Sequence, residues 1–459
     1  MVGRGKNKRW PTEPVTLEID RLSHEGRGIG NIEGKVAFVE GALPGEKVSA
    51  QFINRRRQYD ELKTVTVERP SPDRIEPVCR YATLCGGCSL QHLNPAAQIA
   101  FKRHLLFDRL RHALNINKNS FHELPDLTDR QAGYRRKARL AVRHVARKGG
   151  TLVGFREKFS TFITDMNGCA VLVEPAAALI EPLRHCIDTL QGRRSIPQIE
   201  VAVGEKSGEQ VDAAAAVALI VRHLEPLSEA DTSLWMTFGR EHGCQIYLQP
   251  KGLDTVHKLW PTDNLERLYY HLPDYRLTMA FHPLDFVQVN AGINRRIIPL
   301  ALQLLDLRHS DSVLDLFCGL GNFTLPLARH CRHVTGIEGS SEMVRRGMEN
   351  ASTNTVDNVA FHAADLCNPF KDAPWAQGRF DKILLDPPRS GALEILDDIA
   401  ALKAAKIVYI SCNPATLARD AAVLGDKAYR LCSAGVMDMF PHTAHVESIA
   451  EFEFKGVLK

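Results

Sequence analysis

The feature that most constrains the fold is an alternation of strand-like and helical stretches that begins near residue 283. "SVLDLF" (312–317) is an apolar strand-like run, and "LPLARH" opens a helix soon after it. Further strand-like runs follow at 333–339, 359–366, 380–391 and 406–414. This alternation predicts an α/β domain with a doubly wound parallel sheet. Ligands of such sheets bind outside the carboxyl ends of the strands, so functional side chains are expected there.

The first three strand ends have the character of a nucleotide site. "VLDLFCGLGNF" is a strand, a glycine-rich turn and a helix start, where the backbone can approach a ligand closely. Glu338 ends the second strand, 19 residues beyond Gly319, a spacing at which a carboxylate meets ribose hydroxyls. Asp365 ends the third strand, within reach of an adenine edge. Together the three strand ends predict a nucleotide cofactor.

The fourth strand end narrows the choice of cofactor. "LLDPPRSG" places Asp386 in a rigid Asp-Pro-Pro turn. A dinucleotide enzyme would favour a third glycine in the first turn, where this chain has Asn322 and Phe323. The two turns therefore indicate S-adenosylmethionine and methyl transfer. Amino-group methyltransferases place an aromatic residue after such a turn, and Arg389 stands there instead, which argues against nitrogen methylation.

Cys412 follows the fifth strand, in "YISCNPATLARD". Carbon 5 of a uracil ring is too weak a nucleophile to attack a sulfonium methyl unaided, but a thiolate added to carbon 6 makes carbon 5 electron-rich. The reaction then needs a base for the carbon 5 proton and a pocket for an unstacked base. A cysteine at a strand end, before a Pro-containing turn, fits the nucleophile. The other cysteines outside the N-terminal cluster are expected to pack as small hydrophobic side chains: Cys186, Cys244, Cys318, Cys331, Cys367 and Cys432.

The sequence before residue 283 reads as two further domains behind a basic tail. Residues 1–11 form the tail, and residues 12–72 contain short strands with glycine-rich turns, which predict a small closed β-barrel of a kind that often binds oligonucleotides. The Pro-rich stretch at 70–78 marks a boundary. Residues 73–282 are expected to be a central α+β domain, with a helix over 94–114 capped by Asn94, and residues 283–459 the doubly wound domain.

Charge distribution indicates a nucleic-acid surface more clearly than the net charge of +4 does. Residues 134–158 hold nine Lys or Arg against one acid, and a strand there would align Arg135, Lys137 and Arg139 on one face. A solvated charged face is the alternative. No apolar run approaches the roughly 18 residues of a spanning helix, so a cytoplasmic protein without a membrane partner is expected.

Three closely spaced cysteines indicate a metal site. Cys79, Cys85 and Cys88 have the spacing C-x5-C-x2-C, and Cys169 is the nearest isolated candidate for a fourth thiolate. A total of eleven cysteines, an odd number in a reducing compartment, also favours metal binding or catalysis over disulfides. Thiolate ligation alone fits both zinc and an iron–sulfur cluster.

Five motifs resemble those of the RNA uracil-C5 methyltransferases, and the resemblance spans essentially the whole chain. They are "FVQVNAGIN", "LFCGLGNF", "LLDPPRSG", "YISCNPATLARD" and "MFPHTAHVESIAEF". The resemblance implies Cys412 as nucleophile and Glu447 as the base that removes the carbon 5 proton. It also implies an S-adenosylmethionine pocket with these members: Gln288, Phe317, Asn322, Glu338, Asp365 and Asp386.

The N-terminal barrel resembles a TRAM domain, and the cysteines resemble those of the iron–sulfur branch of this family. That branch implies a [4Fe–4S] cluster held by Cys79, Cys85, Cys88 and Cys169. It also implies 23S ribosomal RNA as substrate, free or in a pre-ribosomal particle, with uracil 1939 as the expected target and no obligate protein partner. Another 23S or tRNA uridine remains open. A catalytically inactive RNA-binding assembly factor and an amino-group methyltransferase are the alternatives of other kinds.

Overall fold

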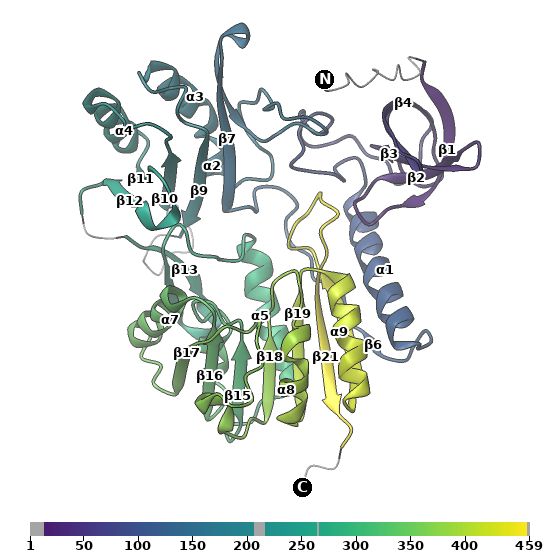
Figure 1. The fold of residues 1–459 in the computed structure, drawn as a ribbon, viewed down its shortest axis with the longest axis vertical. Helices are drawn as coiled ribbons and strands as arrows, with labels where there is room; N and C mark the ends of the chain where they lie inside the picture. The colour runs from purple at the N-terminus through teal and green to yellow at the C-terminus, as the bar shows by residue number, and fades with distance from the viewer. Residues whose placement is uncertain (1–12, 206–215, 264–265, 457–459) are drawn as a thin grey trace, which may run out of the picture. The chain divides into compact units, whose positions relative to one another are not determined.

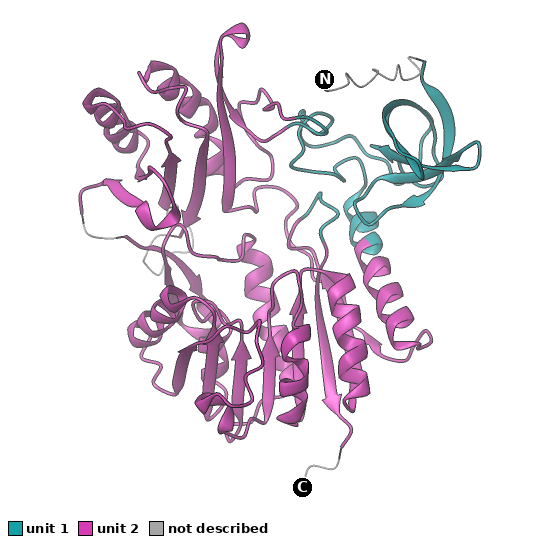
Figure 2. Cartoon of the chain, in the orientation of Figure 1, with its two compact units in different colours: residues 1–101, 157–160, 441–445 teal, residues 102–156, 161–440, 446–459 magenta. Residues whose placement is uncertain are grey.

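The computed structural model describes residues 13–205, 216–263 and 266–456. The chain divides into two compact units, which Figure 2 colours separately: residues 1–101, 157–160 and 441–445, and residues 102–156, 161–440 and 446–459. The expected basic tail, residues 1–11, lies outside the described residues. The division into domains at 12–72, 73–282 and 283–459 stays a prediction. In the described ranges no helix is long and apolar enough to cross a membrane.

The first unit contains the expected closed barrel, with strand order β1-β2-β3-β5-β4 (Figure 1). Its strands are β1 (Val15–Leu22), β2 (Gly28–Ile32), β3 (Lys35–Glu40), β4 (Lys47–Arg55) and β5 (Tyr59–Arg69). Alternate side chains fill the interior, as the burial of Leu17 and Ile19 in β1 and of Ala37 and Val39 in β3 shows. The barrel is therefore packed with side chains, and ligands can meet only its outer surface and loops.

A buried carboxylate, Glu46, fixes the connection that leaves the barrel. Its Oε1 accepts a hydrogen bond from the backbone N–H of Ser71 (3.1 Å), and its Oε2 accepts bonds from the N–H of Leu43 (2.8 Å) and from Nη2 of Arg74 (2.7 Å). Burial alone would raise the pKa of Glu46, but these donors and the charge of Arg74 outweigh it and lower the pKa. This carboxylate is ionised and fully partnered.

The helix expected over 94–114 is confirmed as α1 (Pro95–Leu114). Asn94 Oδ1 accepts a hydrogen bond from the N–H of Ala97 (2.8 Å), so the predicted cap is present. Pro95 occupies the first helical position, where its missing N–H costs nothing. The first unit ends within this helix, at Phe101, and the second begins at Lys102.

The second unit contains a six-stranded sheet with the order β12-β11-β10-β9-β7-β8 and a two-stranded sheet, β13-β14. Their elements are β7 (Lys137–Val145), β8 (Gly150–Gly154), α2 (Glu174–Ala177), α3 (Ile180–Thr189), β9 (Gln198–Gly204), β10 (Ala216–Arg222), α4 (Glu229–Glu241), β11 (Cys244–Gln249), β12 (His257–Trp260), β13 (Leu268–Leu272) and β14 (Leu277–Phe281). Short 3₁₀ helices of the unit lie at Ala146–Lys148, Leu253–Thr255, Pro273–Tyr275, Pro374–Gln377 and Leu393–Ile395.

The same unit contains an eight-stranded sheet with the order β17-β16-β15-β18-β19-β21-β20-β6. In the view of Figure 1, α8 and α9 lie in front of this sheet and α5 behind it. Its elements are β6 (His122–Glu123), α5 (Ala291–Leu305), β15 (Ser312–Leu316), α6 (Thr324–Ala328), β16 (His333–Glu338), α7 (Ser341–Thr353), β17 (Val359–Ala363), β18 (Lys382–Leu385), α8 (Leu396–Ala401), β19 (Lys406–Ser411), α9 (Pro414–Asp426), β20 (Tyr429–Met437) and β21 (Glu447–Phe454).

The expected parallel sheet is present, and further strands extend it on one side. The five strands β15 to β19 are parallel, but β21 lies between β19 and β20 and is antiparallel to both. The short connection from β20 makes an antiparallel hairpin possible, whereas a parallel strand would need a long crossover. The consequence is that β21 begins, rather than ends, at the edge where the parallel strands end.

Three of the six cysteines expected to be buried are not fully buried. Cys367 is exposed, because it lies in a turn after β17 in which its backbone N–H donates to Asp365 Oδ1 (2.9 Å). Cys432 is only partly buried, at the sheet edge in β20. Cys186 is also partly buried, while Cys244, Cys318 and Cys331 are buried as expected.

Candidate active site

Sheet register brings Cys412 and Glu447 together. Cys412 directly follows β19, and Glu447 is the first residue of the antiparallel neighbour β21. Ser411 pairs with Ser448, so the next position on one strand is Cys412 and on the other is Glu447. Asp386 directly follows β18, which pairs with β19 on the other side. The proposed nucleophile therefore lies at the same sheet edge as two carboxyl groups.

Local hydrogen bonds fix the backbone on both sides of Cys412. Ser448 Oγ donates to the carbonyl of Ser411 (3.1 Å), and Ser411 Oγ accepts from the N–H of Asn413 (3.1 Å). Asn413 Oδ1 caps α9 by accepting from the N–H of Ala415 (3.1 Å), and Pro414 occupies the first turn. The thiol is thus held at a rigid junction of strand and helix.

Burial dominates the electrostatics of the three groups. It raises the pKa of the Cys412 thiol to about 11, and Glu447 and Asp386 push that pKa in the same direction while Arg389 opposes them. Burial raises the pKa of Glu447 to about 8, with a further contribution from Asp386, against the positive charges of Arg389 and Lys102. Burial also raises the pKa of Asp386 to about 7. The Cys412 thiol consequently holds its proton at neutral pH, whereas the carboxyl groups of Glu447 and Asp386 exchange protons near neutral pH.

The Asp-Pro-Pro turn is tied to the helix that follows Cys412. The carbonyl of Arg389 accepts hydrogen bonds from Asn413 Nδ2 (3.0 Å) and Thr416 Oγ1 (3.3 Å). Gly391, at φ +83°, passes so close to α9 that a Cβ there would lie 2.5 Å from Asp420 Oδ2. Only glycine fits this approach, so the turn with Asp386 and the junction with Cys412 form one rigid frame.

The glycine turn after β15 has the geometry expected of a cofactor cradle. Phe317, Gly319 and Gly321 all have positive φ (63°, 56° and 93°), which is unusual for the phenylalanine. Glu338 accepts backbone hydrogen bonds from Gly319 (3.0 Å) and Ser340 (3.0 Å), so its carboxylate is fixed at the end of β16. A turn of this kind, with an oriented carboxylate beside it, fits the nucleotide part of S-adenosylmethionine.

The other predicted cofactor residues have partners within the protein. Asn322 Oδ1 accepts from Tyr270 Oη (2.8 Å) and from Asn294 Nδ2 (2.9 Å). The backbone carbonyl of Gln288 accepts from Arg136 Nε (3.0 Å). The exposed Asp365 accepts from Asn368 Nδ2 (2.8 Å) in addition to the N–H of Cys367. Register places Phe317 and Asp386 side by side, since Leu316 pairs with Leu385, while contacts of Gln288, Asn322 and Asp365 with a cofactor stay predictions.

Two buried charged residues near this edge were missed by sequence reasoning. Asp315 is fully buried within β15; burial raises its pKa to about 7, and Thr324 Oγ1 donates to it (2.6 Å). Lys102 is fully buried in α1 and forms an ion pair with Asp438 (2.7 Å). Their signals were a carboxylate inside an apolar strand and a lysine on the apolar face of a helix, three residues after Ile99.

The predicted cationic face is present in part. In β7, Lys137 and Arg139 share the face opposite the buried Ala138 and Leu140, as the alternation predicts. Arg135 precedes the strand, and its Nε donates to the carbonyl of Lys137 (2.9 Å). Lys137 Nζ donates to the carbonyl of Asp285, and burial lowers its pKa to about 8, while Arg139 pairs with Glu200 (2.8 Å). Their contact with RNA stays a prediction.

The N-terminal cysteines lie on a series of tight turns in the first unit. The N–H of Ala82 donates to the carbonyl of Cys79 (3.0 Å), and the N–H of Gly87 points to Cys85 Sγ (3.4 Å). Such N–H contacts to sulfur suit a thiolate that ligates a cluster. Cys169 belongs to the second unit. Across the described ranges, no three His, Cys, Asp or Glu side chains are gathered as ligands of one metal ion.

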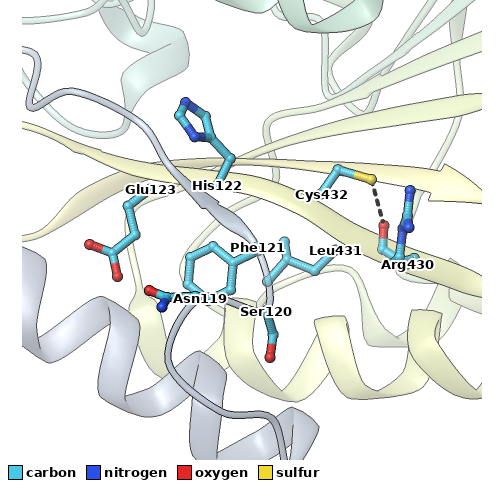
Figure 3. Close-up of a pocket in the computed structure, with 8 residues that line it drawn as sticks. All are labelled: Asn119, Ser120, Phe121, His122, Glu123, Arg430, Leu431 and Cys432. Carbon is cyan, nitrogen blue, oxygen red and sulfur yellow. Dashed lines mark hydrogen bonds between the residues drawn. The ribbon is translucent and has the colours of Figure 1, made fainter.

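A cavity of about 650 Å³ lies away from these sites, at the outer edge of the eight-stranded sheet (Figure 3). It is lined by residues 119–123, which include β6, and by Arg430, Leu431 and Cys432 of β20. Cys432 Sγ donates to the carbonyl of Arg430 (3.5 Å). None of the residues predicted to act in catalysis lines this cavity.

Comparison with known proteins agrees with the fold and the motifs. The family described as tRNA (Uracil-5-)-methyltransferase matches residues 262–453, and the TRAM domain matches residues 12–59. A Hahella chejuensis protein named 23S rRNA (uracil(1939)-C(5))-methyltransferase RlmD is 51% identical over 98% of this chain and 99% of its own. An Alcanivorax borkumensis protein of the same name is 49% identical over 98% of both chains.

A solved structure confirms the predicted fold class. It is the Pyrococcus abyssi tRNA (uracil-54, C5)-methyltransferase in complex with S-adenosyl-L-homocysteine, and it aligns with a TM-score of 0.70 and 23% identity over 95% of this chain and 100% of its own. The barrel and the methyltransferase sheet are thus present as predicted. With near-complete coverage of relatives that are about half identical, the chain belongs to the family of S-adenosylmethionine-dependent RNA (uracil-C5)-methyltransferases.

Proposed function

We propose that this protein methylates carbon 5 of a uridine in 23S ribosomal RNA, the one that corresponds to uracil 1939. The target is supported by the names of relatives that are 51% and 49% identical over nearly the whole chain. The observation that carries the chemistry is the strand register that sets Cys412 opposite Glu447, beside Asp386. A thiol, a proton acceptor and a second carboxyl group at one edge suit addition to a pyrimidine ring.

In the proposed reaction Cys412 Sγ bonds to carbon 6 and the ring becomes an enolate with negative charge at carbon 5. The thiol loses its proton as it adds, and the carboxylate of Asp386, whose pKa is about 7, can take that proton, which leaves Glu447 available for the later step. Bound S-adenosylmethionine supplies the methyl group for carbon 5. Glu447, as a carboxylate, then takes the carbon 5 proton, the C5=C6 double bond re-forms, and the Cys412 thiolate leaves.

The remaining residues are assigned supporting parts in the same proposal. Residues at the strand ends and after β14 hold the cofactor: Gln288, Phe317, Asn322, Glu338, Asp365 and Asp386. The residues proposed to contact RNA phosphates are Arg135, Lys137 and Arg139. The domain limits follow the sequence: TRAM over 12–72, the central domain over 73–282 and the methyltransferase domain over 283–459. Because its substrate is ribosomal RNA, free or in a precursor particle, the enzyme acts in the cytoplasm.

We also propose that Cys79, Cys85, Cys88 and Cys169 hold a [4Fe–4S] cluster. The support is the all-thiolate donor set and the N–H contact to Cys85 Sγ. Because the reaction has no redox step, the cluster would be structural or would position RNA. Anaerobically purified protein should be brown, with about four irons per chain. A colourless protein that contains zinc would contradict the cluster.

The experiment that tests the reaction uses 23S RNA with 5-fluorouridine at the target position. Carbon 5 then carries no proton for Glu447 to remove, so a covalent complex through Cys412 should persist in denaturing gels. The Cys412→Ala protein is the matched control and should form none. Product mapping that shows the methyl group on nitrogen, or on another uridine, would overturn the reaction or the target. A protein that does not bind S-adenosylmethionine would be an assembly factor instead.

A further inference from the structure

The structure contains a buried cation beside the proposed base. Lys102, in α1, has none of its side chain exposed, and its Nζ donates to Asp438 Oδ1 (2.7 Å) and to the carbonyl of Phe440 (3.0 Å). Asp438 is also buried and accepts from Gln131 Nε2 (3.4 Å) on its second oxygen. A buried ammonium group costs desolvation energy and adds little net stability even when paired, so its position calls for another explanation.

Sheet pairing connects this ion pair to Glu447. Asp438 directly follows Met437, and Met437 is the β20 residue paired with Glu447 in β21. The N–H of Asp438 donates to the carbonyl of Leu127 (2.8 Å), so the backbone at this point is fixed as well. Lys102 therefore holds the segment 438–440 in place directly beside the strand position of the base.

Within the described residues, charged groups that act on Glu447 come from the end of β18, the turn after it and α1. Asp386 and the Cys412 thiol lie at the ends of β18 and β19, and Arg389 lies in the turn after β18. Lys102 comes from α1, with Asp438 as its counter-ion. Asp386 favours the protonated form of Glu447, while Arg389 and Lys102 favour the carboxylate. Of the two cations, Arg389 has the larger effect on Glu447 but is exposed to solvent, whereas Lys102 acts from a buried position.

We propose that Lys102 is a positioning residue for the proton-removal step: its positive charge favours the carboxylate form of Glu447, and its bonds to Asp438 and Phe440 hold the strand segment next to Glu447. This proposal rests on Glu447 being the base, as proposed above. Lys102 does not touch the reacting ring. It acts through the protonation state of Glu447, and its loss should therefore be felt most at low pH, where the carboxylate is scarce.

The test measures tritium release from 23S RNA that carries [5-³H]uridine, as a function of pH, because tritium is released when the carbon 5 proton is removed. The Lys102→Met protein keeps the length of the side chain without its charge. Its release rate at pH 7 should fall about tenfold, and its pH midpoint should move up by about one unit, so that the rate recovers above pH 9. The covalent protein–RNA adduct should accumulate at pH 7. Lys102→Arg, which keeps the charge, should retain the midpoint of the unchanged protein.

The matched control is Lys406→Met, which breaks the Lys406–Glu451 ion pair (2.7 Å) elsewhere in the same sheet. It should lower thermal stability without moving the pH midpoint. If Lys102→Met does not fold, the double variant Lys102→Met/Asp438→Leu removes both charges and fills the space with apolar groups, and the midpoint should again move up. An unchanged midpoint in either folded variant overturns the proposal. Absence of tritium release in the unchanged protein would instead overturn the proposed function.

Discussion

Glu46 beside the barrel and Glu447 in the eight-stranded sheet are both enclosed glutamates, yet their pKa values shift in opposite directions. Glu46 accepts two backbone N–H bonds and pairs with Arg74, and these partners lower its pKa below the usual range. For Glu447 burial outweighs the cations around it, and the pKa rises to about 8. Burial makes ionisation of a carboxyl group unfavourable in both places. Hydrogen-bond donors and cations around the group then decide whether it stays an ionised structural group or exchanges protons near neutral pH.

The largest effect is expected from Glu447→Gln. Without a carboxylate the carbon 5 proton has no acceptor, so turnover should fall by about 10³-fold, within the usual range for loss of a general base. Methyl transfer should still occur once, and the methylated RNA should stay bonded to Cys412, which denaturing gels and mass spectrometry of the adduct would show. Normal turnover by this variant would mean that Glu447, like Glu46, takes no part in catalysis.

The counterpart in the barrel is Glu46→Gln. The amide cannot satisfy Arg74 and two backbone N–H groups as the carboxylate does, so the free energy of unfolding should fall by about 3 kcal/mol. Chemical denaturation would measure this loss. Turnover per folded molecule at saturating RNA should not change. A large loss of turnover without loss of stability would remove the distinction between the two glutamates.

An intermediate effect is expected from Arg389→Ala. Arg389 opposes the rise in pKa of both Cys412 and Glu447, so its removal should raise both values. Both groups react in their deprotonated forms, so the rate at pH 7 should fall by roughly tenfold and the pH–rate curve should move to higher pH. Arg389→Lys keeps the charge and should retain most of the rate. A uniform loss of rate at every pH would assign Arg389 to RNA binding instead.

The two glutamates are also expected to differ in how their contributions to stability change with pH. The raised pKa of Glu447 means that the folded protein holds a proton that the unfolded chain releases, so this contribution to stability is complete below pH 4.5 and is lost as the pH rises through 8. Compared with the unchanged protein, Glu447→Gln should therefore gain stability steadily between pH 5 and pH 8.5. Glu46 has the opposite sign: its contribution is present at neutral pH and is lost as the pH falls. Thermal melts across this range would check both signs.

Local patterns in the sequence were sufficient to predict most of the fold. Alternating apolar residues gave the barrel strands, Asn94 and Pro95 gave the start of α1, and the strand ends with Cys412 and Asp386 gave two members of the site. Each of these depends on residues near one another in the chain.

The rest depended on long-range pairing, which no local pattern contains. Insertion of β21 between β19 and β20 places Glu447 opposite Cys412, and only the family resemblance had singled out Glu447. Lys102 and Asp438 are 336 residues apart, so their ion pair could not be read from spacing. Cys367 was assigned to the core by residue type, although its turn geometry exposes it.

The place of β21 has a consequence for synthesis of the protein on the ribosome. β21 follows β20 in the chain but lies between β19 and β20 in the sheet. β19 and β20 therefore cannot form their final pairing until β21 has left the ribosome. A nascent chain that stops short of β21 contains Cys412, the proposed nucleophile, but lacks Glu447, the proposed base. The order of strands thus means that the proposed site is complete only after translation has passed Glu447.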